Sequence, residues 1–455
     1  MEMPSKHALY LSRRIGARGP GTEGEAAAAS YILRCMGDSG AEVNMESFSC
    51  WKSDLDALLI LYLAAIAGYG LFRLSFTASM VVAILVWFAF QMETYSWAIV
   101  SRILPRSQAS NVVGRVPAAG GARRRVVITA NYDTTMSSPL GRPGIARAYR
   151  VLYIIAFIFI TVLVVLSIVG LGASLTHVSR RVINSIWLYS SPAALYLLLM
   201  ALLLAIGRGR GRYTVGANDN ASGVGVMLST LQVIAADPLE HTEVWGVATA
   251  RGAAGGRGMV ALLKRHGYQL KDAYIINVDH VGHDELKVIT REGIILGFRN
   301  SGRLKRLIFQ AAVRSKGLRG LRKGRCRVKR SDAMVATVRS FRAITIGGLR
   351  GGSYFGYRNE ADSIDRLERA GLDRAFKLLR VTLDEIDTEG TKRGPSRRLD
   401  EELSAEKEAG GDGEEEAAVP DGEETGEPER RGRRARGTRP RRERPRQTIR
   451  EEPGE

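Results

Sequence analysis

Hydrophobic residues follow two different patterns along this chain. In four segments, at roughly 57–74, 76–92, 151–175 and 186–206, they occupy every side of the expected helix and leave no polar face. The last two segments are long enough to cross about 30 Å of hydrocarbon, whereas the first two are shorter and joined by a tight turn. We therefore predict four inserted transmembrane helices. A shallow hairpin is the alternative for the first pair, and buried core helices are the alternative for both pairs.

The rest of the chain, up to about residue 388, alternates between the periods of strands and of helices. Strands are predicted at Val43–Ser49, Asn111–Val116, Arg125–Ala130, Glu243–Ala248, Ala273–Val278 and Ala343–Ile346. Helices are predicted at Glu23–Met36, 223–235, Gly258–His266, Leu304–Ser315 and from Ile364 to about Ile386. This alternation favours an α/β fold, a mostly parallel mixed sheet flanked by helices.

The two patterns divide the chain into six parts. The α/β domain is assembled from residues 1–53, 103–148 and 208–387, the helix pairs occupy residues 54–102 and 149–207, and a tail covers residues 388–455. The tail is mainly acidic in Asp400–Glu427 and mainly arginine in Arg430–Arg450. Because neither block can bury enough apolar surface to fold, we predict a disordered tail.

Charge and cysteine content indicate the compartment. Most arginines near the apolar segments lie on the side of the α/β domain, and the short opposite loops carry only Arg73, Arg180 and Arg181. The positive-inside rule then predicts a multi-pass protein of the cell membrane, with the soluble domain and both termini in the cytoplasm. The three scattered cysteines suggest a reducing compartment without a disulfide framework. Residues 1–50 are polar, so we expect no cleavable signal peptide.

The stretch Gly216–Gly223, which reads Gly-Ala-Asn-Asp-Asn-Ala-Ser-Gly, is the most informative motif. It places Asp219 on a glycine- and asparagine-rich turn that opens a predicted helix. An aspartate in that position can bridge two metal ions when other carboxylates and imidazoles converge on it. Other segments of the chain must therefore supply those partners.

Several segments in order resemble the co-catalytic di-zinc aminopeptidase family, metallopeptidase family 28, which includes glutaminyl cyclases and the transferrin-receptor ectodomain. The segments are Ala8-Leu9, Ile15–Arg18, Glu25, Asn111–Gly114, Val126–Asp133, Gly216–Gly223, Val244–Arg257, Asn277–Asp279, Ser331-Asp332 and Ala361–Asp365. The resemblance covers the soluble part between about residues 8 and 386, with the apolar segments as insertions. It implies a zinc-aminopeptidase-like fold and, in an intact member, zinc-dependent release of amino acids from peptides.

The resemblance assigns two of the expected zinc ligands to aspartates that are retained. The bridging carboxylate matches Asp219, and the ligand on the following strand end matches Asp279. In the family a His-x-Asp motif supplies a ligand and the carboxylate that orients it. Here the motif reads Asn131-Tyr132-Asp133, so the orienting Asp133 remains while an amide, a poor zinc ligand, replaces the imidazole.

The remaining positions are replaced by residues that cannot do the chemistry. The family's Glu-Glu pair, a general base followed by a ligand, falls on Ala250-Arg251. A methyl group cannot accept a proton, and a guanidinium cannot ligate a cation. The last histidine falls on Arg358 or, as the second choice, on Tyr357.

These replacements indicate a degenerate zinc site. We expect the three aspartates to form a salt-bridge cluster with Arg251 and Arg358, which would replace the metals and repel zinc. No cofactor is expected, and Asp219 and Asp279 are the ligands only if some metal binds. We thus predict a membrane-anchored, catalytically inactive peptidase-like protein that serves as a binding or scaffold module. The alternatives are an active zinc-dependent membrane aminopeptidase with unusual ligands, and a lipid- or nucleic-acid-binding protein acting through its basic tail.

Three further features bear on the expected partners. His280 and His283 are interpreted as loop residues near the pocket rim, and the basic run Arg314–Arg330 as a solvated or membrane-facing loop. The second apolar pair lies between Asp133 and Asp219, so the pocket mouth is expected to face the bilayer or the helices. The predicted partners are membrane lipid and a peptide or membrane protein, whereas nucleic acid is not expected.

Overall fold

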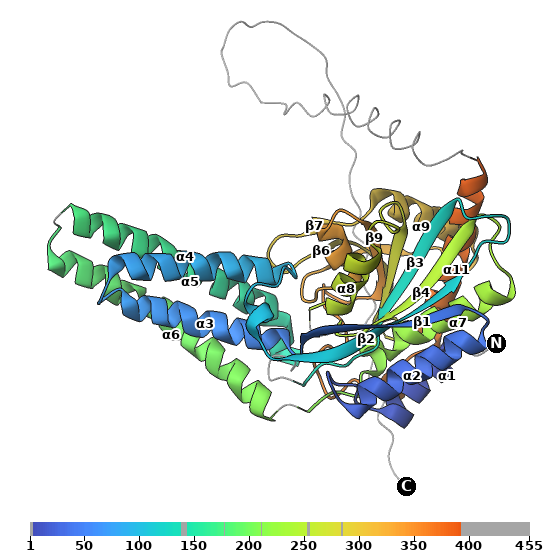
Figure 1. The fold of residues 1–455 in the computed structure, drawn as a ribbon, viewed down its shortest axis with the longest axis horizontal. Helices are drawn as coiled ribbons and strands as arrows, with labels where there is room; N and C mark the ends of the chain where they lie inside the picture. The colour runs from blue at the N-terminus through green and yellow to red at the C-terminus, as the bar shows by residue number, and fades with distance from the viewer. Residues whose placement is uncertain are drawn as a thin grey trace, which may run out of the picture. The chain divides into compact units, whose positions relative to one another are not determined.

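The computed structural model describes residues 3–137, 143–176, 178–210, 212–252, 255–283 and 285–392 (Figure 1). The acidic and arginine-rich blocks of the predicted disordered tail lie outside these residues. Within them, a sheet domain and a bundle of long helices are built from interleaved parts of the chain.

The domain is built on a nine-stranded mixed sheet. In spatial order its strands are β1 (Glu42–Trp51), β2 (Arg106–Val116), β4 (Thr242–Thr249), β3 (Arg124–Asn131), β5 (Tyr274–Asp279), β9 (Arg342–Gly348), β6 (Leu286–Glu292) and β7 (Phe298–Arg299), while β8 (Arg322–Cys326) pairs with β6. The central strands β4, β3, β5 and β9 run parallel, whereas β1, β2, β6 and β7 add antiparallel pairs at the edges. The predicted α/β class is confirmed.

Helices cover both faces of the sheet, which explains the continuous apolar sequence of its central strands. On β3, Val126 and Ile128 face one cluster of buried residues and Val127 faces another. The first cluster is completed by α1 (Pro4–Leu9), α2 (Glu23–Asp38), α7 (Ser222–Ala236), α9 (Gly302–Arg314) and α11 (Arg369–Lys392). The second is completed by α8 (Arg257–His266) and α10 (Asp332–Val338). Short turns of helix lie at Tyr10–Ile15, Val100–Ile103, Ala217–Ala221 and Ile364–Arg366.

The sequence pattern missed most of the elements between β5 and β9, although it predicted α9. Strands β6, β7 and β8 and helix α10 were not predicted, and α11 begins at Arg369 instead of Ile364. The loop predicted for the basic run is corrected, because part of this run forms β8, with the sequence Arg-Lys-Gly-Arg-Cys. Such a strand shows no apolar alternation, because it lies at the sheet edge and pairs only with β6 among the described strands.

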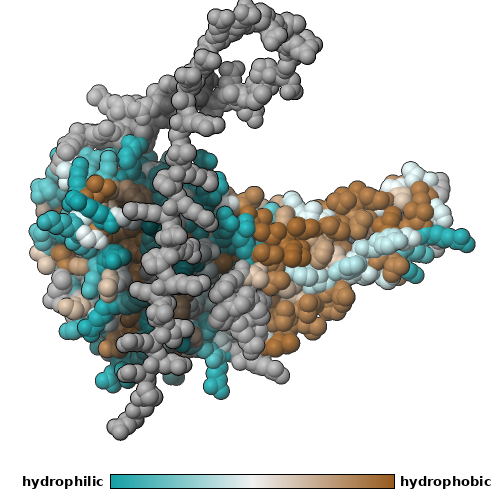
Figure 2. Space-filling model, turned by 180° about the vertical axis from the view of Figure 1, so that it is seen from behind, coloured by the Kyte–Doolittle hydropathy of each residue, from teal (hydrophilic) through white to brown (hydrophobic). Residues whose placement is uncertain are grey.

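Four helices form the bundle: α3 (Asp54–Leu71), α4 (Phe76–Thr94), α5 (Pro143–Leu175) and α6 (Arg180–Arg210) (Figure 1). Among the described residues, three segments are long and apolar enough to cross a membrane: Phe76–Thr94, Ala148–Leu175 and Arg181–Arg208. The expectation of four such helices is therefore corrected to three. The apolar helix Leu55–Leu71 in α3 is shorter than these three segments. Much of the bundle surface is apolar, as Figure 2 shows.

A buried acidic residue fastens the bundle to the domain. The Glu93 carboxylate, at the end of α4, accepts hydrogen bonds from the backbone N–H groups of Ile99 and Ser101 at 2.8 and 2.9 Å. It also accepts one from Arg257 of α8 at 3.3 Å. Because both ends of this ion pair are nearly inaccessible to water, α4 is held in one position relative to the sheet.

Candidate functional site

The loop before α7 is fixed by close backbone contacts. Gly216 has a φ of +57°, and a Cβ atom on Gly223 would lie 2.3 Å from the carbonyl oxygen of Val278. Both positions therefore require glycine. The Asp362 carboxylate accepts hydrogen bonds from the backbone N–H groups of Asn218 and Asp219 at 2.7 and 2.8 Å. Together these contacts hold Asp219 beside the carboxyl end of β5.

A lysine lies between the two retained ligand-type aspartates. The Nζ atom of Lys329 is 2.9 Å from Oδ1 of Asp219 and 3.0 Å from Oδ1 of Asp279. Lys329 follows β8, Asp279 ends β5 and Asp219 precedes α7, so three separate elements supply the group. The side chains are only 4%, 2% and 1% exposed, which makes this a buried ion cluster and not a surface salt bridge.

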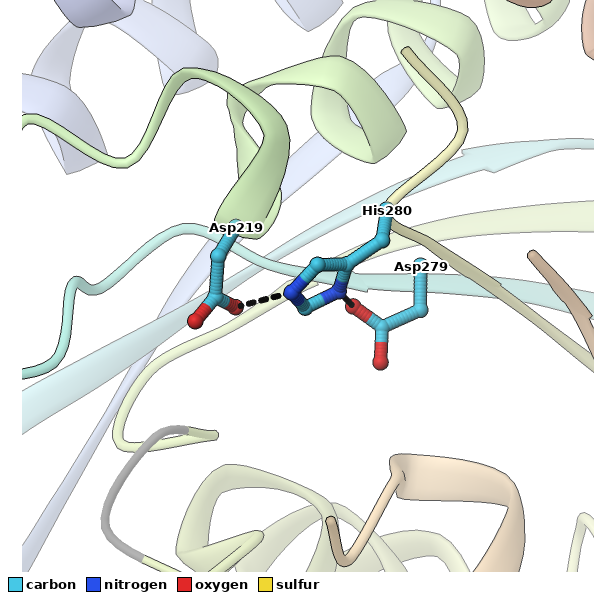
Figure 3. Close-up of side chains that lie close together, drawn as sticks. All are labelled: Asp219, Asp279 and His280. Carbon is cyan, nitrogen blue, oxygen red and sulfur yellow. Dashed lines mark hydrogen bonds and ion pairs between the residues drawn. The ribbon is translucent and has the colours of Figure 1, made fainter. Parts of the chain in front are cut away.

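His280 is the fourth member of the cluster and also contacts both aspartates. Its ring lies between the two carboxylates, with Nδ1 2.7 Å from Oδ1 of Asp279 and Nε2 3.4 Å from Oδ1 of Asp219 (Figure 3). The ring stacks on Tyr354 with a centroid separation of 4.3 Å. The expectation that His280 lies near the pocket rim is wrong, because this histidine is fully buried in the centre. His283 is stacked on Phe355 at 3.8 Å.

The charges within the cluster stabilise one another. Burial works to raise the pKa of Asp279, but the positive charges of Lys329 and His280 and their hydrogen bonds bring this pKa below its usual range. Burial likewise works to lower the pKa of Lys329, and the two aspartates raise it above its ordinary value instead. Lys329 is therefore an ammonium ion at neutral pH, and it stands where a divalent cation would contact the same oxygens.

Asn131 and Asp133 lie together at the end of β3. The Nδ2 atom of Asn131 donates to Oδ1 of Asp133 at 3.3 Å, and Oδ1 of Asn131 accepts from Asn220 at 3.4 Å. Asp133 also accepts a hydrogen bond from the backbone N–H of Gly252 at 2.8 Å. Burial and the negative charge of Glu25 raise the pKa of Asp133 to about 7, against the effect of Arg251. Asp133 thus orients its neighbours and is not fully ionised at neutral pH.

The structure places Ala250 and Arg251 at the end of β4, but the arginine does not join the aspartate cluster. Its Nε and Nη2 atoms donate to the carboxylate of Glu25 at 2.8 and 3.1 Å, and further bonds reach Ser107 and the carbonyl oxygen of Gln108. The expected salt bridge between Arg251 and the aspartates is therefore corrected. Ala250 is buried, and its methyl group offers no base.

Arg358 is buried beside Tyr357, with its guanidinium carbon 5.5 Å from the ring centroid. The cation between Asp219 and Asp279 is Lys329, which belongs to the basic run predicted to form a solvated or membrane-facing loop. One signal was available, since Lys329 directly precedes the Arg330-Ser331-Asp332 segment, and Ser331-Asp332 carries part of the family resemblance. Only the folded chain brings this lysine to the end of β5.

These residues do not fit a pair of metal ions. Ligand atoms of Asp219, Asp279 and His280 lie within 4.8 Å of one another, and Oδ2 of Asp219 is buried without a hydrogen-bond partner in the described structure. However, the ammonium group of Lys329 is already in contact with both carboxylates. A zinc ion between them would face this charge directly, and the positions of the other expected ligands hold an amide and arginines.

Comparisons with known proteins agree with the family resemblance. The sequence model of peptidase family M28 matches residues 190–383. No curated protein matches the chain.

Solved structures with a similar course of the chain include three bacterial enzymes. A leucine aminopeptidase precursor from Bacteroides thetaiotaomicron is 13% identical, with a TM-score of 0.49 over 83% of this chain and 96% of that one. A zinc aminopeptidase from Bacillus subtilis is 13% identical, with a TM-score of 0.49 over 84% and 94% of the two chains. A glutaminyl cyclase from Bacteroides thetaiotaomicron is 12% identical, with a TM-score of 0.48 over 83% and 96%. Similarity at this level gives no information on activity.

Proposed function

The chain belongs to peptidase family M28 through residues 190–383, and on that premise we propose that it is a membrane-anchored, non-catalytic peptidase-like protein. In this role the domain serves as a binding or scaffold module. The observation that carries the proposal is the contact of the Lys329 ammonium group with both Asp219 and Asp279.

Two independent deficits support the loss of peptide hydrolysis. The first is electrostatic, because a tethered cation neutralises the carboxylates that would otherwise attract a metal ion. The second is chemical, because Ala250 stands at the general-base position and cannot take a proton from water. Restoring either feature alone would leave the other deficit in place.

Membrane anchoring is supported by the three long apolar helices and the apolar surface of the bundle. We propose that the sheet domain lies on the cytoplasmic side, because arginines concentrate at the domain ends of the helices. The side of the membrane on which the domain lies can be tested independently of catalysis. A cysteine introduced at exposed Tyr268 should be labelled by an impermeant maleimide only after the cells are opened, and labelling of intact cells would contradict this orientation.

The test of catalytic inactivity is metal analysis together with a peptidase assay on the full-length protein in detergent. We expect well below one zinc per chain and no release of amino acids from unblocked peptides when zinc is supplied. Near-stoichiometric zinc with peptide cleavage would overturn the proposal. It would favour the second candidate, a metallo-aminopeptidase in which His280 joins Asp219 and Asp279 as a ligand. The Asp219→Asn variant is the control that separates bound zinc from contamination.

A further inference from the structure

A cavity lies at the end of the helix bundle that joins the sheet domain, outside the aspartate cluster. It has a volume of about 400 Å³ and is bordered by the segments where the chain passes between the sheet domain and the helices. These segments are Trp51–Ser53 with the start of α3, Leu104–Arg106 after α4, and Leu204–Arg208 near the end of α6. Their convergence places the cavity at the level where a membrane-embedded bundle would meet the aqueous domain.

The cavity wall is apolar on the side of the bundle. Leu55 and Leu59 from α3 and Leu204 from α6 line it. The apolar surface continues along α3, where Leu63, one helical turn after Leu59, is 49% exposed. A hydrocarbon chain lying in the cavity could therefore continue along α3 without contact with water, which a water-soluble peptide would not do.

The other side of the cavity carries positive charge. Lys52, Arg106 and Arg208 line it and are exposed, and the only carboxylate among the described lining residues belongs to Asp56. Asp56 lies 3.3 Å from Arg208 and offsets its charge, which leaves Lys52 and Arg106 as the net positive groups. A basic patch beside an apolar wall matches the two ends of an anionic lipid.

One residue joins this cavity to the candidate site. Trp51 lines the cavity, and its carbonyl oxygen lies 3.5 Å from Nη1 of Arg251. The guanidinium carbon of Arg257, which also contacts Glu93, lies 4.0 Å from the centre of the Trp51 ring. A molecule in the cavity would thus contact a side chain that belongs to the rigid joint between the bundle and the domain.

We propose that this cavity binds an anionic phospholipid, with its headgroup phosphate at Lys52 and Arg106 and its acyl chain against Leu55, Leu59 and Leu204. The proposal rests on the membrane anchoring proposed above. It names the ligand class as a lipid of the surrounding bilayer, bound next to the degenerate centre but not within it.

The experiment uses the full-length protein in a neutral detergent and measures bound lipid by native mass spectrometry. Phosphatidylglycerol should bind about tenfold more tightly than phosphatidylcholine, and the Lys52→Gln/Arg106→Gln double variant should lose most of this difference. The matched control is Arg322→Gln/Lys323→Gln, which removes two exposed cations from β8 and should leave the preference unchanged. Leu59→Trp, which fills the apolar wall without changing charge, should weaken the binding of both lipids.

Several outcomes would overturn the lipid site. The first is an equal preference for phosphatidylglycerol in the double variant and its control. The second is unchanged lipid binding in Leu59→Trp. The third is displacement of the bound lipid by inorganic phosphate as effectively as by added lipid. Size-exclusion profiles of all variants confirm that each is folded before binding is compared. Failure of membrane anchoring is a different result, since the unmodified protein would then remain soluble and monodisperse without detergent.

Discussion

Lys329 and Arg251 are two buried cations of the candidate site, and they neutralise different carboxylates. Arg251 occupies a position that the family resemblance assigns to a metal ligand, yet it binds Glu25 of α2. Lys329 comes from outside the expected ligand set, yet it contacts both retained ligand-type aspartates. Replacement of a ligand by a cation therefore does not reveal which carboxylate that cation will neutralise. The neighbourhood in the folded chain determines the pairing.

The largest effect is expected from Lys329→Ala in metal-free buffer. This change leaves two buried carboxylates facing each other without the cation that neutralises them, and it should lower the free energy of unfolding by about 3–5 kcal/mol. Thermal unfolding in detergent measures the loss. Lys323→Ala, on the exposed side of β8, is the control and should change stability by less than about 0.5 kcal/mol. Similar behaviour of the two variants would show that the lysine does not compensate the aspartates.

The same variant should gain an affinity for divalent cations. With the ammonium group gone, Asp219, Asp279 and His280 offer three ligand atoms within 4.8 Å of one another. At a zinc concentration of about 100 times Kd, binding would restore about 2.7 kcal/mol of stability. Titration of the unfolding temperature with zinc chloride tests this. Absence of a zinc-dependent shift in Lys329→Ala, or an equal shift in the unchanged protein, would refute the idea that Lys329 occupies the place of a metal ion.

A smaller loss is expected from Glu25→Gln at the other cation. The amide side chain introduced by this change can still accept one hydrogen bond from Arg251, whose guanidinium keeps its bonds to Ser107 and Gln108. The loss should therefore be about 1–3 kcal/mol. Glu23→Gln in the same helical turn, where the side chain is exposed, is the matched control for chemical denaturation. If both variants lose the same stability, the Arg251–Glu25 ion pair does not stabilise the fold.

The sequence predicted the architecture of the sheet domain better than it predicted the ion pairs of the candidate site. Strands such as β3 and β5 have apolar centres, Val126–Ile128 and Tyr274–Ile276, so their burial between helices follows directly from the pattern. The positions of Asp219 and Asp279 followed from the family resemblance. The contact with Lys329 could not be predicted, because it depends on β8, a polar edge strand without alternation. Charge runs are usually solvated, and only the tertiary structure shows that one member of this run is buried.

The smallest change in stability at acidic pH is expected from Asp133→Asn. This variant tests how burial, Glu25 and Arg251 together set the pKa of Asp133. Burial, followed by repulsion from Glu25, raises the pKa of Asp133 to about 7, well above its ordinary value of 3.8. The folded protein therefore holds a proton that the unfolded chain releases. The resulting stabilisation is complete below about pH 4 and is lost as the pH rises through 7.

The amide side chain of the Asp133→Asn variant remains uncharged throughout, so this variant should lose stability less steeply than the unchanged protein between about pH 5.5 and 8. Below about pH 4, where Asp133 is protonated in both the folded and the unfolded chain, the two proteins should differ by less than about 1 kcal/mol, because an amide resembles a protonated carboxyl group. Asp332 and Asp362, whose pKa values burial raises to about 6, keep a shallower dependence in both proteins. Denaturation curves at the two pH values measure the slopes, with exposed Asp373→Asn as control. Parallel slopes for Asp133→Asn and the unchanged protein would mean that Asp133 is already ionised in the fold, so that Arg251 outweighs burial and Glu25.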